Sequence, residues 1–356
     1  MTDSTATAAR PAPNIAVPFE FRATGGEYFR IWIVNLLLTI LTLGIYSAWA
    51  KVRRLRYLYG STSLAGSAFE YHGEPLQILK GRLIAVAVFG AYAITTRFWP
   101  KSVFVLLPVL ILLLPLVVVF SRRFQMRMTS WRGIRFGFHG RYPGAFVAYV
   151  AWGIVAIVTL YLLLPLWLYK RVGFLVDNTS LGTQRFEFTA WRGRFFGFYY
   201  ATLGLMVAAF LALILLGALF GGAAGSQDGP PSAAAMAGLG TAFVVGIIAV
   251  ALVVGAFWER SFTNAAYDGI GLGPHRLTCR IRMGRLLWLY ATNVVGVLLT
   301  LGLFYPWALI RRLRYQFECM AVECSGSLDE FAAAAAPPAS ATGEAIGESF
   351  DLDFGL

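Results

Sequence analysis

The chain has 356 residues, of which 58% are hydrophobic and only 13% are charged. Soluble globular proteins carry about 25% charged residues, so the composition excludes an ordinary soluble enzyme and a largely disordered chain. The net charge is +12, but the basic residues cluster at the ends of apolar runs. This placement is typical of cations at cytoplasmic lipid headgroups and does not indicate nucleic-acid binding.

The two ends of the chain differ in composition from the rest. Met1–Pro18 is rich in Ala, Pro and Thr, and Ser325–Leu356 carries six acidic residues and no basic one. Both segments are predicted to be disordered tails. The first 27 residues contain no basic stretch followed by an apolar one, which predicts that there is no cleavable signal.

Several apolar segments approach the length of about 20 residues that a helix needs to cross a bilayer. They are Phe29–Ala50, Leu79–Thr96, Ser102–Phe120, Ala145–Tyr169, Phe196–Phe220, Gly238–Trp258 and Leu286–Ile310. Tryptophans lie near several of the segment ends, as interfacial aromatics do. The segments therefore predict a polytopic α-helical membrane protein rather than a soluble helical core.

An internal repeat relates the first and last apolar segments. Asn35–Tyr57 aligns without a gap to Asn293–Tyr315, with 12 of 23 positions identical. Another copy aligns Thr62-Ser63-Leu64 with Thr179-Ser180-Leu181. The pattern predicts five units, each with a Phe-x-aromatic strand, an apolar section, a basic cluster and a turn, at about 19–68, 69–135, 136–185, 186–274 and 275–324. The loop stretches between apolar sections are predicted to form small β-hairpins at the membrane surface.

The basic clusters leave two arrangements open for the first, third and fifth units. If each long segment crosses once, the basic loop of the third unit lies opposite the first two loops, against the cytoplasmic bias of Lys and Arg. If these units enter and return, with breaks at Thr42-Leu43-Gly44, near Pro165 and at Thr300-Leu301-Gly302, all basic loops are cytoplasmic. Each leg would then span about 11 residues, roughly 16 Å, and protein would have to cover the backbone of the tip. Length favours the single crossing, whereas charge and repeat favour the hairpin.

Four polar residues inside apolar segments are candidate substrate contacts. Asn35 and Asn293 are equivalent in the repeat, as are Thr42 and Thr300. Broken helices in transporters expose carbonyls to solutes, but interhelical hydrogen bonds for the asparagines and plain kinks at the threonines are simpler interpretations. Candidate lipid-headgroup ligands are Arg53, Arg54, Arg311 and Arg312.

The sequence contains no pattern that indicates an enzyme or a metal site. Cys279, Cys319 and Cys324 form no zinc motif, and the equivalent His72 and His139 are predicted to be structural residues of hairpins. No nucleophile–base motif is present, and no acidic residue lies deep within an apolar segment, which argues against an ion-coupled carrier. We therefore expect no catalytic residue, no metal and no cofactor.

The first unit resembles the YjgN family of bacterial inner-membrane proteins. The residues that carry the resemblance are Glu27-Tyr28-Phe29, Leu41-Thr42-Leu43-Gly44-Ile45-Tyr46-Ser47-Ala48-Trp49-Ala50-Lys51, Arg56-Tyr57, Phe69-Glu70-Tyr71 with Gly73, and Leu79-Lys80-Gly81-Arg82. The likeness extends over about Phe19 to Glu323, although Tyr161 replaces the glycine in the third unit. It implies a polytopic inner-membrane protein with a domain of unknown function and provides no catalytic residues.

Together these observations predict an all-α polytopic membrane protein with internal repeats and small cytoplasmic β-hairpins, located in the bacterial inner membrane with both tails cytoplasmic. The expected role is non-enzymatic, either channel-like, lipid-associated or structural, and the alternative is a secondary transporter of a small solute. Expected partners are membrane lipids and a second copy of the chain.

Overall fold

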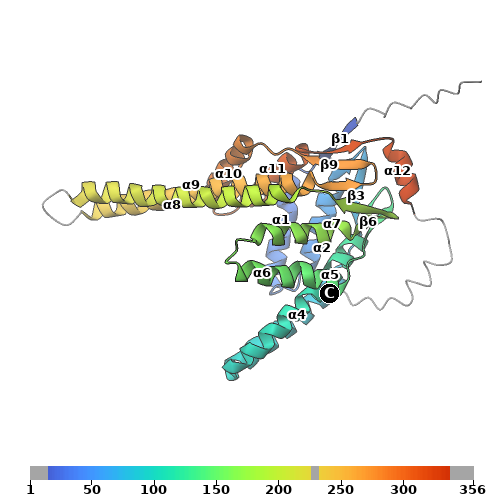
Figure 1. Ribbon diagram of the computed structural model, residues 1–356, viewed down its shortest axis with the longest axis horizontal. Coiled ribbons are helices and arrows are strands. Elements are labelled where there is room, and N and C mark those ends of the chain that lie inside the picture. Colours follow the sequence, from blue (N-terminus) through green and yellow to red (C-terminus); the bar gives the residue numbers. More distant parts are fainter. Residues whose placement is uncertain (1–14, 226–231, 337–356) are drawn as a thin grey trace, which may run out of the picture.

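The computed structural model describes residues 15–225 and 232–336, in which short strands form one closed antiparallel barrel and helices leave one end of it (Figure 1). The strands are β1 (Ile15–Phe21), β2 (Thr62–Leu64), β3 (Ser67–Tyr71), β4 (Thr129–Trp131), β5 (Ile134–Phe138), β6 (Thr179–Leu181), β7 (Gln184–Phe188), β8 (Ile270–Leu272), β9 (His275–Cys279) and β10 (Met320–Cys324).

The barrel is assembled from hairpins that lie far apart in the sequence. Strands β2–β3, β4–β5, β6–β7 and β8–β9 are hairpins, and each joins the next by pairing such as that of β3 with β4. The two ends of the described chain complete the ring, because β1 pairs with β10 and, further along, with β2. An isolated two-stranded hairpin is marginally stable and has two unpaired edges. Closure removes all of these edges.

A ring of apolar side chains fills the barrel at one level. Each member faces its Cα partner on the neighbouring strand of the same unit, in the pairs Phe19–Leu64, Phe69–Trp131, Phe136–Leu181, Phe186–Leu272 and Leu277–Val322. The four phenylalanines follow one another with ring centroids 6.3, 6.4 and 6.3 Å apart. The Phe-x-aromatic repeat is therefore the pattern that builds the barrel core.

The prediction of an all-α fold with separate small hairpins is wrong, because the hairpins form this barrel. The strands that pair across the helical sections contribute only three to seven residues each. Their partners are separated in sequence by whole helical sections, so local alternation indicates the hairpins but not their assembly.

Helical pairs with a tight turn follow β1, β5 and β9. They are α1 (Gly25–Leu41) with α2 (Ser47–Gly60), the continuous run α5 (Tyr142–Phe146), η2 (Val147–Ala151) and α6 (Trp152–Val158) with α7 (Leu164–Asp177), and α10 (Met283–Leu299) with α11 (Tyr305–Glu318). The chain thus turns back within the apolar segments of the first, third and fifth units. The legs α1 and α2 have 17 and 14 residues, or about 25 and 21 Å, and are longer than the sequence suggested.

The side chain of Thr42 binds backbone groups at the tip between α1 and α2. Thr42 Oγ1 donates to the Leu38 carbonyl at 2.7 Å and accepts from the Tyr46 amide at 2.9 Å. Thr300 makes the equivalent bonds to Gly296 and Phe304 at 2.7 and 2.9 Å. These bonds satisfy part of the backbone at the two tips without protein cover.

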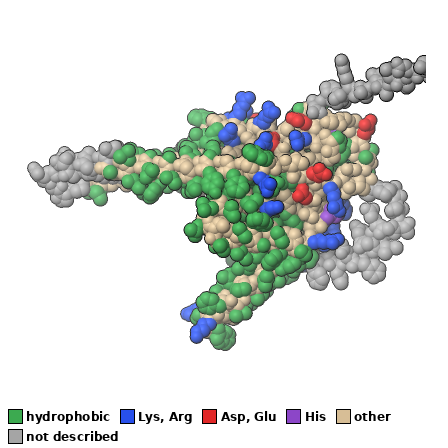
Figure 2. Space-filling model, viewed as in Figure 1, with side chains coloured by type: hydrophobic (Ala, Val, Ile, Leu, Met, Phe, Trp, Pro, Cys, Tyr) green, Lys and Arg blue, Asp and Glu red, His purple; other side chains and the backbone are tan. Residues whose placement is uncertain are grey.

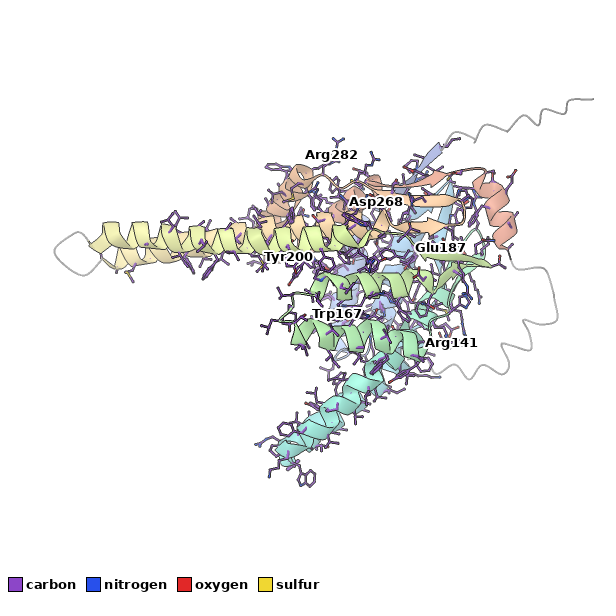
Figure 3. All side chains as sticks on the ribbon, in the orientation of Figure 1. Arg141, Trp167, Glu187, Tyr200, Asp268 and Arg282 are labelled. Carbon is purple, nitrogen blue, oxygen red and sulfur yellow. The ribbon has the colours of Figure 1, made fainter. Side chains whose placement is uncertain are left out.

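The third unit turns at Thr159, six residues before Pro165. Tyr161 adopts φ 65° at the position where Gly44 and Gly302 have φ 92° and 94°. Protein does cover this tip, because Tyr199 and Tyr200 donate to the carbonyls of Tyr161 and Leu162 at 3.0 and 2.8 Å (Figure 3).

Four helices of the described part are long and apolar enough to cross a membrane, with candidate spans at Pro75–Phe98, Pro100–Arg127, Arg192–Ala218 and Met236–Tyr267. They correspond to α3 (Pro75–Phe98), η1 (Pro100–Ser102) with α4 (Val103–Arg127), α8 (Arg192–Gly225) and α9 (Ala233–Tyr267). Figure 2 shows hydrophobic side chains over these projecting pairs, and charged side chains gathered mainly towards the barrel.

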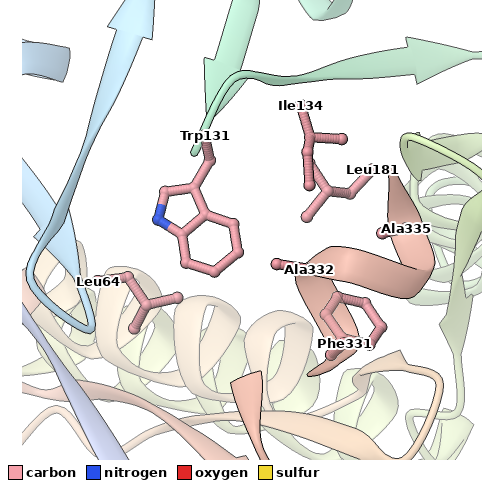
Figure 4. Packing of buried hydrophobic residues seen from close by; sticks show 7 residues of the cluster. All are labelled: Leu64, Trp131, Ile134, Leu181, Phe331, Ala332 and Ala335. Carbon is pink, nitrogen blue, oxygen red and sulfur yellow. The ribbon is translucent and has the colours of Figure 1, made fainter. Parts of the chain in front are cut away.

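The described structure extends into both predicted tails. Residues 15–18 belong to β1, where they pair with β10, and α12 (Leu328–Ala335) closes the hairpin-tip end of the barrel (Figure 4). Phe331, Ala332 and Ala335 bury themselves against the barrel core, and Arg132 forms an ion pair with Asp329. This short apolar face was not predicted, because the composition of the tail as a whole is acidic. Residues 1–14 and 337–356 lie outside the described residues.

Changing Gly182 to alanine is expected to detach α12. A Cβ at Gly182 would lie 1.9 Å from the Ala335 carbonyl oxygen, a contact that backbone cannot accommodate. Hydrogen exchange of the α12 amides should become much faster. Gly273→Ala is the matched control, because Gly273 has a similar φ of 57° but its Cβ would lie 3.7 Å from Phe331. Equal exchange in both variants would contradict this role of Gly182.

Candidate functional site

A pocket of about 370 Å³ lies among the first helical pair, α3 and α11. Its polar lining consists of Asn35 and Thr39 from α1, Ser47, Lys51 and Arg54 from α2, and Arg82 from α3, with tyrosines Tyr28 and Tyr305. Three basic residues thus converge from two helices. The i, i+3 spacing of Lys51 and Arg54 places both on one face of α2, and Arg82 lies two turns into an apolar span.

Asn35 places a buried acceptor without a partner in this pocket. The residue is 8% exposed, and its Nδ2 donates to the Ala50 carbonyl at 3.4 Å. Its Oδ1 has no hydrogen-bond partner among the described residues. A buried acceptor without a partner costs about 1–3 kcal/mol, so a ligand that donates a hydrogen bond would be favoured there.

Within the described part of the chain, the three cations have no carboxylate partner. None of the ion pairs found in the described residues includes Lys51, Arg54 or Arg82. Arg82 donates to the Ser47 hydroxyl, and this bond does not neutralise charge. Ionised side chains at membrane depth are costly unless an anion or water accompanies them. The pocket is therefore suited to an anionic group.

The equivalent pocket of the fifth unit is compensated internally. It has a volume of about 490 Å³ and is lined by Asn293 and Arg312. Arg311 donates to Asn293 Oδ1 at 2.9 Å, and Arg312 pairs with Glu259 at 2.9 Å. The repeat positions of Ser47 and Lys51 are Tyr305 and Leu309 here. Of these two copies, the first has a buried acceptor and cations that remain open to a ligand.

The site residues predicted from the sequence lie partly in these two pockets and partly outside them. Asn35 and Arg54 share the first pocket, Asn293 and Arg312 share the second, and Tyr305 lines both. Arg311 bonds to Asn293. The remaining predicted site residues line neither pocket: Thr42 and Thr300 cap helical turns, and Arg53 lies on another face of α2.

Comparison with known proteins places the chain among bacterial proteins. The family model described as "Bacterial protein of unknown function (DUF898)" matches residues 16–349. The chain belongs to this family. It is similar to "Inner membrane protein YjgN" of Salmonella typhimurium (32% identity over 40% of this chain and 37% of the relative) and of Escherichia coli K12 (38% over 34% and 31%). These matches span about a third of the relatives' length, and no solved structure matches the chain. The predicted resemblance to the YjgN family is confirmed.

Lys51 and Arg82 of this DUF898 chain were not among the site residues predicted from the sequence. Both stand within the motif residues that carry the family resemblance. A cation inside an otherwise apolar span was the signal that could have identified Arg82. Its spatial neighbours on α2 follow only from the packing of α2 against α3.

Another basic pocket, the Arg141 pocket, has a volume of about 770 Å³ and lies where α4 and α5 meet the barrel (Figure 3). Its other polar side chains are Arg123, Arg127, His139, Asn178 and Arg185. His139 Nε2 is joined to Ser180 Oγ by a hydrogen bond of 2.9 Å, and His72 makes the equivalent 2.8 Å bond to Ser130. These bonds fasten neighbouring hairpins together, in keeping with a structural role for both histidines.

Proposed function

We propose that this protein is a non-enzymatic inner-membrane protein that binds the headgroup of an anionic phospholipid in the pocket of Asn35. The observation that carries the proposal is the convergence of Lys51, Arg54 and Arg82 beside an acceptor without a partner. The lining offers cations, hydroxyls, an amide and aromatic rings, a set that binds anions without a nucleophile–base pair.

Both parts of a lipid headgroup fit this set. A phosphodiester supplies the negative charge that the three cations need, and guanidinium groups bind phosphate oxygens with two parallel hydrogen bonds. A headgroup hydroxyl supplies the donor that Asn35 Oδ1 needs. Phosphatidylglycerol has both features, whereas phosphatidylethanolamine has no net negative charge.

The sidedness of the barrel supports access to this lipid from the cytoplasmic leaflet. A single closed barrel holds all the hairpins, so the basic clusters that precede them lie on one side of the helical pairs. Cytoplasmic loops collect Lys and Arg, and we therefore place the barrel and the described ends of the chain in the cytoplasm. The helical pairs of the first, third and fifth units then enter the bilayer and return.

Neutralising the pocket is expected to weaken lipid binding in a position-dependent manner. Attraction of a cation to an anionic surface is worth about 1 kcal/mol, or about fivefold in affinity. Native mass spectrometry of the purified full chain should show one tightly held phosphatidylglycerol, with affinity lowered about fivefold by Lys51→Gln, Arg54→Gln or Arg82→Gln and further by the triple variant.

Arg53→Gln is the matched control, because it removes the same charge from the same helix outside the pocket. Arg141→Gln tests whether the Arg141 pocket contributes to lipid binding. Equal losses in Arg53→Gln and Arg54→Gln would show general surface attraction and overturn the site. Phosphatidylethanolamine and inorganic phosphate are the other two ligands compared in the same binding experiment. Tight binding of inorganic phosphate alone would replace the lipid by a free anion as the ligand.

A further inference from the structure

The interior of the barrel contains a cavity of about 410 Å³, within the range of roughly 300–1,000 Å³ typical of small-molecule sites. It is lined by the apolar ring of Phe19, Phe69, Phe136, Phe186, Leu277 and their partners. An eight-stranded barrel is just wide enough for side chains to fill or to hold one small ligand. With ten strands, the interior is wider, and even aromatic side chains leave space.

The cavity extends along the barrel from the plug to the helices. Leu328 and Phe331 of α12 line it at the hairpin-tip end (Figure 4). Met126, Leu175 and Tyr267, from the last turns of α4, α7 and α9, line it at the other end. Hydrophobic molecules dissolved among the helices are therefore the molecules closest to this end of the cavity.

Two buried polar side chains in this lining have atoms without partners. Trp131 is 2% exposed and His275 is 3% exposed. Neither Trp131 Nε1 nor either ring nitrogen of His275 has a hydrogen-bond partner among the described residues. A bridging water needs two to four polar partners, which a lining dominated by aromatic and aliphatic groups supplies poorly.

We infer that the barrel lumen binds an uncharged amphiphile, an apolar chain or ring with one hydroxyl or carbonyl oxygen that hydrogen-bonds to Trp131 or to His275, which stand on the opposite strands β4 and β9 of the ring. The indole N–H donates only, and a neutral imidazole offers one donor and one acceptor. Burial lowers the pKa of His275, which keeps its ring neutral at pH 7. A carboxylate would lose its hydration in this apolar space, so a neutral oxygen is the better partner.

The site is independent of the Asn35 pocket, and the two differ in the charge of the ligand. The Asn35 pocket presents three cations, whereas the lumen presents mainly aromatic and aliphatic side chains around two neutral heterocycles, and its one lining cation, Arg276, is exposed. Failure of either binding experiment therefore leaves the other unaffected.

Photolabelling of the full chain in membrane vesicles tests the inference. Three probes share one diazirine-bearing hexadecyl chain and end in a hydroxyl, a carboxylate or a methyl group. We expect the alcohol to crosslink lumen residues such as Phe69 and Phe136, and His275→Phe combined with Trp131→Phe to reduce this labelling about tenfold. Labelling of α8 serves as the internal reference.

Two further variants keep the test decisive. Trp191→Phe changes an indole that is 73% exposed and should leave lumen labelling unchanged. Leu272→Phe narrows the lumen beside His275, its Cα partner in the β8–β9 hairpin, without replacing either heterocycle, and should reduce labelling. Absence of lumen adducts would overturn the site. Equal labelling by the alcohol and the methyl-ended probe, or preference for the carboxylate, would overturn the assigned class of ligand.

Discussion

Replacing Trp131 by alanine is expected to lower the free energy of unfolding of the barrel by about 3–5 kcal/mol, the usual cost of deleting a large buried aromatic side chain. Trp131 is 2% exposed, faces Phe69 across the strand pair and lies under the Arg132 guanidinium at 4.7 Å. It also belongs to the cluster that receives α12. The loss should appear as a lower urea midpoint, followed by tryptophan fluorescence of the detergent-purified protein.

The control for this substitution is Trp191→Ala, because Trp191 lies between β7 and α8 and is 73% exposed. Its removal should change the free energy of unfolding by less than about 1 kcal/mol. Similar losses in both variants would mean that the barrel is not the unit whose core Trp131 stabilises.

The β-hairpins could be predicted from the sequence, but the barrel could not. Alternation and turn residues are local, so Thr62–Leu64 and Ser67–Tyr71 were recognisable as paired strands. Pairing of Phe69 with Trp131 requires knowledge of where the two intervening helices return the chain. The unused clue was physical: several similar hairpins each have open edges, and a ring is the arrangement that pairs them all.

The candidate site was predictable to a similar degree. Asn35 was identified because a polar side chain interrupts an apolar segment, and Arg54 because it belongs to a repeated basic cluster. The difference between Asn35 and Asn293 was not visible, since both stand in matching contexts. It arises from Arg311, whose guanidinium reaches Asn293 Oδ1, and rotamer choice of this kind is not encoded by spacing.

Cysteine accessibility is expected to give an all-or-none pattern across the membrane. In a chain whose natural cysteines are replaced, Ala65→Cys at the β2–β3 turn and Glu187→Cys on β7 should react with an impermeant maleimide only after spheroplasts are permeabilised. Lys101→Cys, between α3 and α4, should react in intact spheroplasts. All three positions are exposed in the structure, so a lack of reaction reports the membrane barrier and not burial.

The comparison of Ala65 with Glu187 decides between the two arrangements of the helical pairs. If the first and third units each crossed the bilayer once, their hairpins would lie on opposite sides. Of these two variants, only Glu187→Cys would then react from outside. One barrel cannot be divided by a bilayer, because its strand pairs would then have to pass through hydrocarbon. Opposite labelling would therefore refute both the closed barrel and the returning helices. Labelling of both positions from outside would preserve the barrel and reverse its orientation.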